Sequence, residues 1–475
     1  MKVNEKLLDE KLAALEKART WSPRVVSKLE SLIRAEDDFA LFRVNPIALA
    51  SEKNIAETES IDLFLHATKL GLFEMNWNLL CPFCSDIVTS FASLKTVHSH
   101  FFCTMCREGT DATLDDFIQV SFTVSPQIRT IAAHDPESLS VQDYYLKYRF
   151  SREGRIPGGP RFIEAIPRML KHMSYFAPGE KKNIRIELER GQIMGHDLLN
   201  NAGFMYDVSE TRAKGIQAVS VRFSETKAEP DQGSALSGTT DFEIENTAAK
   251  KASLLLLAFP PGHVNSPLEF EPYLSGKKLL STQSFRDLFR TEVIEGEEGI
   301  GVRDLTFLFT DLKGSTELYD RIGDLKAFAL VRQHFDTLGK VVSGNRGAIV
   351  KTIGDAVMAT FLSPEDAIKA ATGMIDEIQE FNDGPDGKRI ILKIGVHKGA
   401  SIAVTLNERL DYFGQSVNIA ARVQGLADAE EIYVTEDVYG FPGVRELLSS
   451  YHITPKKARL KGVQDEMQVY RIEHR

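Results

Sequence analysis

The chain has 475 residues and a mass of 53.0 kDa, which leaves room for about three domains. Its 43% hydrophobic and 26% charged residues are ordinary for a globular protein, and its net charge of −10 argues against general binding to nucleic acid or anionic membranes. The longest aliphatic run, Leu254 to Leu257, is too short to cross a bilayer, and residues 1–6 lack the apolar core of a signal peptide. These features predict a cytoplasmic protein without a membrane partner.

Residues 1–75 are predicted to form a helical first domain. Leucines recurring over residues 3–35 indicate one or two amphipathic helices, broken near Ser22-Pro23. Residues 45–52 and 60–71 then resemble a helix-turn-helix or winged-helix pair, which is one way to bind DNA. Acidic residues dominate around the second helix, where a recognition helix normally carries basic or amide side chains. Packing or protein contact is therefore favoured and nucleic acid is an unlikely partner; the residues concerned are Glu57, Glu59, Asp62 and Lys69.

Residues 76–125 are predicted to form a zinc ribbon. All four cysteines of the chain lie here in two C-x-x-C pairs, Cys81/Cys84 and Cys103/Cys106. This spacing is typical of structural zinc sites, and the thiols of a cytosolic protein are more often metal ligands than disulfides. We expect one structural Zn²⁺ in a closed tetrahedral site. His98 and His100 lie between the pairs and offer alternative ligands, although four thiolates already complete the tetrahedron.

Residues 126–283 are predicted to form a β-rich regulatory domain. Short stretches with period-two alternation lie between Gly, Pro and Asn residues, which favours a small antiparallel β-sandwich. A helix is expected over 161–172 and a mobile loop over 226–239. The predicted strands, beginning with one just before the domain, are 117–124, 184–188, 216–223, 242–245 and the fully apolar 252–259. No chemistry is evident in this region.

Residues 284–302 are predicted to be a linker, with an acidic, glycine-bearing stretch at 295–299 as the domain joint. The last predicted domain, residues 303–475, begins with a buried strand that ends at Asp311. A helix over 319–342 follows, with apolar positions at Leu325, Phe328, Leu330, Val331 and Phe335. The remaining predicted elements are a hairpin over 347–361, helices over 364–381 and 417–426, strands over 389–396 and 432–434, and a C-terminal hairpin of 458–462 with 467–472.

Two carboxylates, Asp311 and Asp355, each lie where a predicted strand ends, and Gly354 supplies a tight turn beside the second. Such a pair suits two Mg²⁺ or Mn²⁺ ions that also bind phosphate oxygens. Lys313-Gly314-Ser315 is not a phosphate-binding P-loop, because the earlier glycine of that motif is absent. Asp311, Lys351, Gly354-Asp355, residues 395–399 and residues 411–422 follow one another in an order and spacing that resembles the catalytic domain of class III adenylyl/guanylyl cyclases.

This resemblance implies an α+β multidomain protein with a C-terminal ferredoxin-like βαββαβ domain. It also implies roles for single residues: Asp311, Asp355 and the carbonyl of Leu312 as metal ligands, and Asn418 for orienting the ribose. Arg422 would stabilise the transition state and Lys461 would hold the terminal phosphates. Lys393 stands where relatives often carry Arg, so its role is open, because Lys cannot supply a bidentate fork.

The resemblance further implies that Lys351 and Asp411 contact the base. Adenine offers an acceptor at N1 and a donor at its amino group, which a Lys donor and an Asp acceptor match. ATP is therefore the expected substrate, with a homodimer as the expected assembly and an unknown ligand or protein as regulator. The zinc and β-rich regions resemble an uncharacterised module found before some bacterial cyclases. Two alternatives remain, a catalytically weak nucleotide-binding regulator and a zinc-ribbon nucleic-acid-binding protein with an attached cyclase.

Overall fold

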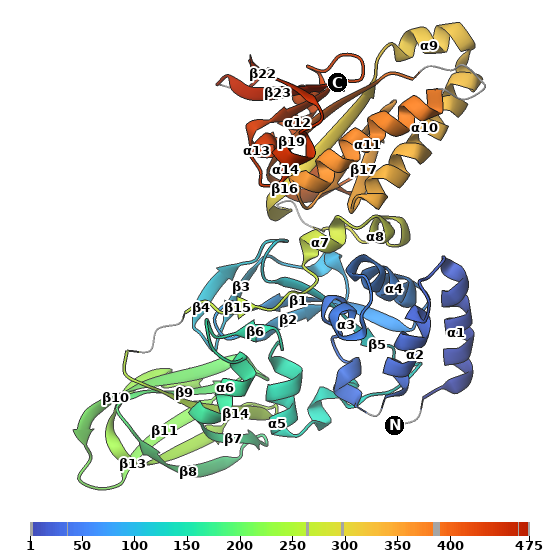
Figure 1. The fold of residues 1–475 in the computed structure, drawn as a ribbon. Helices are drawn as coiled ribbons and strands as arrows, with labels where there is room; N and C mark the ends of the chain where they lie inside the picture. The colour runs from blue at the N-terminus through green and yellow to red at the C-terminus, as the bar shows by residue number, and fades with distance from the viewer. Residues whose placement is uncertain are drawn as a thin grey trace.

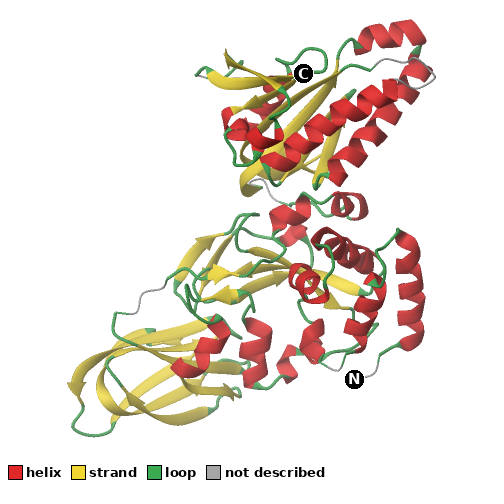
Figure 2. Ribbon diagram, in the orientation of Figure 1, coloured by secondary structure: helices red, strands yellow, loops and turns green. Residues whose placement is uncertain are grey.

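The structure is a computed structural model that describes residues 3–35, 37–262, 266–295, 299–382, 390–463 and 465–473. Figures 1 and 2 show a central region of helices and small sheets, a large β-sheet region on one side of it, and a C-terminal α/β domain on the other. The short helices α7 (Gly276–Leu280) and α8 (Gln283–Leu288) lie between the central region and the C-terminal domain (Figure 1). Within the described ranges, no helix is long and apolar enough to span a membrane.

The N-terminal helices follow the predicted leucine periodicity. Helix α1 (Glu5–Ala18) starts at Asn4, whose side chain accepts a hydrogen bond from the amide of Leu7, and it buries Leu8, Leu12 and Leu15 along one face. The chain breaks as predicted around Pro23, and α2 (Val25–Arg34) follows.

The predicted helix pair is present as α3 (Pro46–Lys53) and α4 (Glu57–Lys69). The acidic side chains of α4 are used within the chain, since Glu57 pairs with Lys278 and Asp62 pairs with Arg19. Glu59 accepts a hydrogen bond of 2.7 Å from the amide of Ser22. These contacts agree with the packing role expected for this helix, and the winged-helix arrangement itself is not confirmed.

The cysteine region contains two small sheets. Strands β1 (Phe73–Leu80), β2 (Ile87–Phe91) and β5 (Ile118–Val124) form a sheet in the order β2-β1-β5. Strands β3 (His100–Cys103) and β4 (Glu108–Asp111) form a separate hairpin. The proposed limit between residues 75 and 76 falls inside β1, because the strand pairs with β5 from Phe73 onward.

The β-rich region contains one sheet of eight strands, which follows α5 (Val141–Asp143), β6 (Gly154–Arg155) and α6 (Phe162–Met169). Its order is β12-β11-β13-β10-β9-β14-β7, with β8 also paired to β13. The strands are β7 (Leu170–Phe176), β8 (Lys181–Leu188), β9 (Gly191–Asp197), β10 (Ala202–Arg212), β11 (Gln217–Phe223), β12 (Ala228–Glu229), β13 (Gln232–Asn246) and β14 (Ala252–Phe259); β15 (Glu269–Phe270) pairs with β6.

Three sequence predictions for this region were wrong. The sheet is mixed rather than antiparallel, because β13 pairs in parallel with both β10 and β11. The predicted mobile loop 226–239 contains β12 and the first half of β13. The backbone of residues 232–235 in β13 pairs with residues 205–208 of β10. The predicted helix over 161–172 ends at Met169, since Leu170 and His172 join a strand pair with the apolar β14.

The C-terminal domain has the predicted βαββαβ order. Its strands form a sheet in the order β17-β18-β16-β19-β21-β23-β22, with β20 paired to β19. The strands are β16 (Ile300–Leu312), β17 (Gly347–Ile353), β18 (Ala356–Phe361), β19 (Leu392–Leu406), β20 (Arg409–Phe413), β21 (Ile432–Thr435), β22 (His452–Ala458) and β23 (Met467–Glu473). The helices are α9 (Ser315–Ile322), α10 (Asp324–Gly344), α11 (Pro364–Asn382), α12 (Gln415–Gln424), α13 (Glu436–Tyr439) and α14 (Val444–Leu447).

Details of this domain differ from the prediction. The helix over 319–342 is divided into α9 and α10 at Gly323, whose φ of +79° ends a helix. Leu325 and Phe328 are exposed rather than buried, at 88% and 63%. The first strand of the C-terminal hairpin is 452–458 instead of 458–462. Arg389, at the start of a predicted strand, and residues 296–298 of the predicted joint lie outside the described residues.

Candidate active site and metal centre

The hairpin of β17 and β18 presents Asp355 at its tip. Ile353 and Ala356 form the last strand pair, so Gly354 and Asp355 are the two turn residues. Gly354 has φ +64°, a conformation that glycine adopts without steric cost and that suits the first position of such a turn. Among the described residues, no group donates a hydrogen bond to the buried Oδ2 of Asp355. An unsatisfied buried carboxylate oxygen is a suitable ligand for a cation.

Asp311 lies on the neighbouring strand at the same end of the sheet. In β16, Phe309 is paired with Met358 of β18, and Thr310 Oγ1 accepts a hydrogen bond of 3.1 Å from the amide of Val357. Continuing this register places Asp311 beside Ala356, the residue after Asp355. Asp311 Oδ2 lies 2.7 Å from Lys393 Nζ on the paired strand β19. The two carboxylates thus lie at the same end of the sheet, where the ammonium group of Lys393 already contacts Asp311.

Lys351 and Asp411 form an ion pair between β17 and β20. The Asp411 side chain is buried at 8% exposure, and its Oδ1 accepts a hydrogen bond of 2.8 Å from the amide of Tyr412. The Lys351 side chain is 37% exposed, so its ammonium group remains accessible from solvent. The pair therefore presents a hydrogen-bond donor and an acceptor side by side.

Asn418 and Arg422 are one turn apart on α12, as their spacing predicted. Asn418 is exposed and Arg422 is partly buried. The Arg422 guanidinium lies against Gly462, where an added Cβ would be 3.4 Å from Nη1. Since Lys461 immediately precedes that glycine and is exposed, the loop between β22 and β23 brings a second cation close to Arg422.

The predicted site residues lie in three local groups in the structure, and we treat them below as two sets. The first set is Asp311, Asp355 and Lys393, which lie at one end of the sheet. The second set contains Lys351, Asp411, Asn418, Arg422 and Lys461. Within the described ranges, Asp311 forms an ion pair with Lys393 and Lys351 forms one with Asp411, and no ion pair joins the first set to the second.

His334 of α10 was missed by the sequence analysis. It is fully buried, and burial lowers the pKa of its imidazole while the nearby Asp355 acts in the opposite direction. Its Nδ1 lies 3.2 Å from the carbonyl oxygen of Val331. The available signal was a histidine at the helical spacing of the buried Leu330, Val331 and Leu338.

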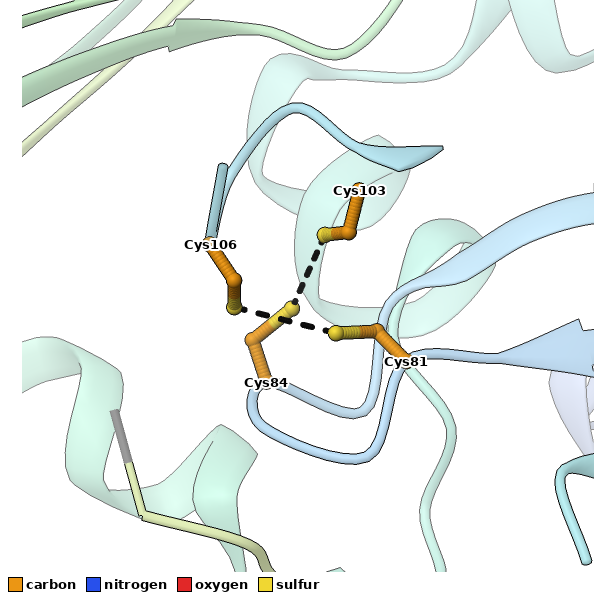
Figure 3. Close-up of side chains that lie close together, drawn as sticks. All are labelled: Cys81, Cys84, Cys103 and Cys106. Carbon is orange, nitrogen blue, oxygen red and sulfur yellow. Dashed lines mark hydrogen bonds between the residues drawn. The ribbon is translucent and has the colours of Figure 1, made fainter. Parts of the chain in front are cut away.

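The four cysteines come together in one buried cluster (Figure 3). Their Sγ atoms all lie within 4.8 Å of one another, with Cys81 and Cys106 at 3.7 Å and Cys84 and Cys103 at 3.6 Å. None of these pairs is a disulfide. A tetrahedron of sulfur atoms around Zn²⁺, with Zn–S of about 2.3 Å, has edges of about 3.8 Å. The sulfur distances of 3.6 and 3.7 Å match this edge, so the cluster has the donor set and close spacing that a zinc ion requires.

The two C-x-x-C segments have similar backbones. The residue after each second cysteine, Ser85 and Arg107, has positive φ, at +60° and +57°. The chain also turns back on itself at each pair, since the amide of Ser85 donates to the carbonyl of Cys81 and that of Arg107 to Cys103. Both pairs thus sit on tight turns that aim their thiols at one point. The histidines point elsewhere: His100 contacts Asp111 at 2.8 Å, and His98 packs against Phe91.

We expect purified protein to contain about one equivalent of Zn²⁺ per chain, because four buried thiols gathered within 4.8 Å of one another offer the donor set of a closed zinc site. Elemental analysis after gel filtration measures this. Cys84→Ser and Cys103→Ser should each lose the metal, whereas His100→Ala should retain it. Zinc-free protein after purification under reducing conditions would contradict the assignment.

The comparisons with known proteins separate the chain into two parts. Residues 301–474 match the adenylate and guanylate cyclase catalytic domain, so the C-terminal domain is of the class III nucleotide cyclase type, as predicted. Residues 7–287 match a family of unknown function (DUF5939). Because this match covers more than half of the 475 residues, the chain belongs to that family. The family description does not confirm the predicted zinc-ribbon module.

The curated relatives are similar mainly over part of the chain. An adenylate cyclase of Anabaena cylindrica is 30% identical over 186 residues, which cover 36% of this chain and 37% of the relative. A putative adenylate cyclase 3 of Rhizobium meliloti is 29% identical over 161 residues, covering 33% and 27%. The chain thus spans 37% and 27% of the length of these two relatives.

Solved structures with some likeness include the adenylyl cyclase CyaB from P. aeruginosa, at 22% identity and a TM-score of 0.32 over 37% of this chain and 96% of that one. The guanylate cyclase domain of RhGC from Catenaria anguillulae, solved with GTP, has 21% identity and a TM-score of 0.33, covering 37% and 98%.

Proposed function

We propose that this protein is an adenylate cyclase that converts ATP to 3′,5′-cyclic AMP and pyrophosphate. The observation that carries the proposal is the Lys351–Asp411 ion pair, which presents a donor and an acceptor together. The Watson–Crick edge of adenine has the complementary acceptor and donor. Guanine presents a carbonyl where adenine has its amino group, so Asp411 would face another acceptor. The named adenylate cyclase relatives are consistent with this choice.

The other residues have roles that follow from charge. Cyclisation requires in-line attack of the ribose 3′-oxygen on the α-phosphorus, with pyrophosphate leaving, and negative charge grows on the phosphate oxygens. Arg422 is the group we assign to that charge, and Lys461 in the adjacent loop is assigned to the terminal phosphates. Asn418, one turn from Arg422 and exposed, is assigned to the ribose.

Asp311, Asp355 and the backbone carbonyl of Leu312 are the proposed ligands of two Mg²⁺ or Mn²⁺ ions. The unsatisfied Oδ2 of Asp355 and the cation already beside Asp311 both fit such a role. These ions would lower the pKa of the 3′-hydroxyl and neutralise the phosphate chain. Lys393 would then offer its charge to a phosphate when a metal ion takes its place on Asp311.

A homodimer is the proposed active form, with each site built from the first set of one chain and the second set of its partner. Two exposed apolar side chains support this arrangement: Ile353, at 50% exposure, precedes the Asp355 turn, and Phe413, at 64%, follows Asp411 by two residues. Their burial against a second chain would remove this apolar surface from water. We further propose a cytoplasmic protein whose N-terminal region binds a regulatory ligand or protein.

Product analysis tests the substrate assignment. Purified protein incubated with Mn²⁺ should form cyclic AMP from ATP and at least tenfold less cyclic GMP from GTP, the ratio expected for about 1.4 kcal/mol of discrimination. Lys351→Ala should lower the ATP rate and this preference together. The exposed Lys340 provides a matched control, since Lys340→Ala removes the same charge from helix α10 and leaves the Lys351–Asp411 pair unchanged. A wild-type preference for GTP would overturn the assignment.

A further inference from the structure

Helix α8 connects the N-terminal family region to the catalytic domain and contacts both strands that carry the ion pair. It lies between the central region and the C-terminal domain in Figure 1. The DUF5939 match ends at residue 287, inside this helix. Two of its side chains, Gln283 and Arg286, reach across the boundary to β17 and β20.

Gln283 holds the edge of the catalytic sheet next to Lys351. Its Oε1 accepts a hydrogen bond of 2.7 Å from the amide of Ile349 in β17, the edge strand of the sheet. The register of β17 with β18 shifts between Ile349 and Lys351, so Val350 is a bulge residue. A bulge changes the direction in which the following side chain points. The Gln283 bond fixes the strand immediately before the bulge, and with it the direction of Lys351.

Arg286 holds the other partner of the ion pair. Its Nη1 donates a hydrogen bond of 3.2 Å to the carbonyl of Leu410, and its guanidinium lies 5.4 Å from the ring centre of Tyr412. Leu410 and Tyr412 are the two neighbours of Asp411, and the amide of Tyr412 also binds the Asp411 carboxylate. Arg286 therefore restrains β20 on both sides of Asp411.

The position of α8 is in turn set by the N-terminal region. Phe285, 1% exposed, packs edge-on against Trp77 of β1 with ring centres 6.2 Å apart. Strand β1 continues directly into the first cysteine pair at Cys81. Before α8, Lys277 of α7 binds Asp115 at 2.7 Å. These contacts orient α8 against residues of the N-terminal region, one of them on the strand that leads into the cysteine cluster.

We propose that Gln283 and Arg286 are positioning residues that hold Lys351 and Asp411 in register for the base, so that α8 lets the N-terminal region set nucleotide affinity and selectivity. The inference rests on the proposed function, because it takes the ion pair as the base-recognition site. It goes further by naming the element through which the family region acts on that site.

Binding of 3′-deoxy-ATP and 3′-deoxy-GTP with Mg²⁺ to the full chain, measured by calorimetry, tests the proposal without turnover. Gln283→Met removes the acceptor at nearly constant size, and Gln283→Glu retains one. Arg286→Ala removes both contacts to β20, and Arg290→Ala removes an exposed charge just beyond the helix as a control. We expect the preference for the adenine probe to fall about tenfold in Gln283→Met and Arg286→Ala, as for one lost hydrogen bond. Gln283→Glu and Arg290→Ala should keep the wild-type preference.

Wild-type selectivity in both Gln283→Met and Arg286→Ala would overturn the proposal and leave the proposed function standing. An equal loss in Gln283→Glu and Gln283→Met would also overturn it, since the acceptor would then be irrelevant. If the wild-type chain binds the adenine probe selectively but forms no cyclic AMP, the proposed enzyme activity is refuted. The binding measurements on the variants then still decide the positioning role. Chain that binds neither probe would overturn both. Thermal unfolding of each variant shows which of them are folded.

Discussion

Asp355→Ala and Asp311→Ala should each lower the cyclisation rate on the order of a thousandfold or more, about 4 kcal/mol of barrier, while leaving the fold intact. Both carboxylates lie at the end of the sheet where strands terminate, and Asp355 makes no hydrogen bond through Oδ2 within the described residues. Removing either one therefore costs little packing. It does remove a proposed ligand of the ions that would neutralise the phosphates.

Asp304 provides the matched control for this experiment. It is a carboxylate on the same strand β16, and it binds Lys398 at 3.2 Å near the opposite end of the strand from Asp311. Because surface ion pairs contribute at most about 1 kcal/mol, Asp304→Ala should retain most of the activity. Cyclic AMP formation and thermal unfolding are measured for all three variants. More than a tenth of wild-type activity in Asp311→Ala or Asp355→Ala would show that the metal assignment is wrong.

The parts of the fold that depend on local pattern could be predicted from the sequence. The hairpin of β17 and β18 is an example, since alternating β-branched residues and the turn at Gly354 specify it within 15 residues of chain. The same holds for the cysteine turns, whose C-x-x-C spacing fixes two thiols at a time. The site residues could be proposed because they occur as a series of motifs in a known order, and the structure brings two of them, Lys351 and Asp411, into an ion pair.

The remaining features depend on distant partners. Residues 232–235 have the composition of a loop and become a strand because β10 offers an unpaired edge for parallel pairing. The contact of Gln283 with Ile349 joins residues 66 positions apart, and nothing in either segment alone indicates it. Phe328 occupies an apolar helical position yet is exposed, because the helix periodicity says which residues share a face and not which neighbour covers that face.

Mixing Asp311→Ala chains with Arg422→Ala chains should restore activity that neither has alone. The two substitutions belong to different sets, and within the described residues no ion pair joins those sets in one chain. In a symmetric dimer with two shared sites, a hybrid of the two variants contains one site with both substitutions and one site with neither. The intact site combines the unaltered Asp311 and Asp355 of one chain with the unaltered Arg422 of the other.

The expected recovery is a defined fraction of the wild-type activity. Random exchange in an equal mixture gives about half hybrid dimers, each with one working site of two, so the activity should reach about a quarter of that of wild type. Exchange is verified with differently tagged chains, and a mixture of Asp311→Ala with Asp355→Ala is the control, because both changes fall in the same set and no hybrid site is complete. Recovery only in the first mixture is the result that requires a shared site. Absence of recovery in both mixtures, with exchange demonstrated, would place the whole site within one chain.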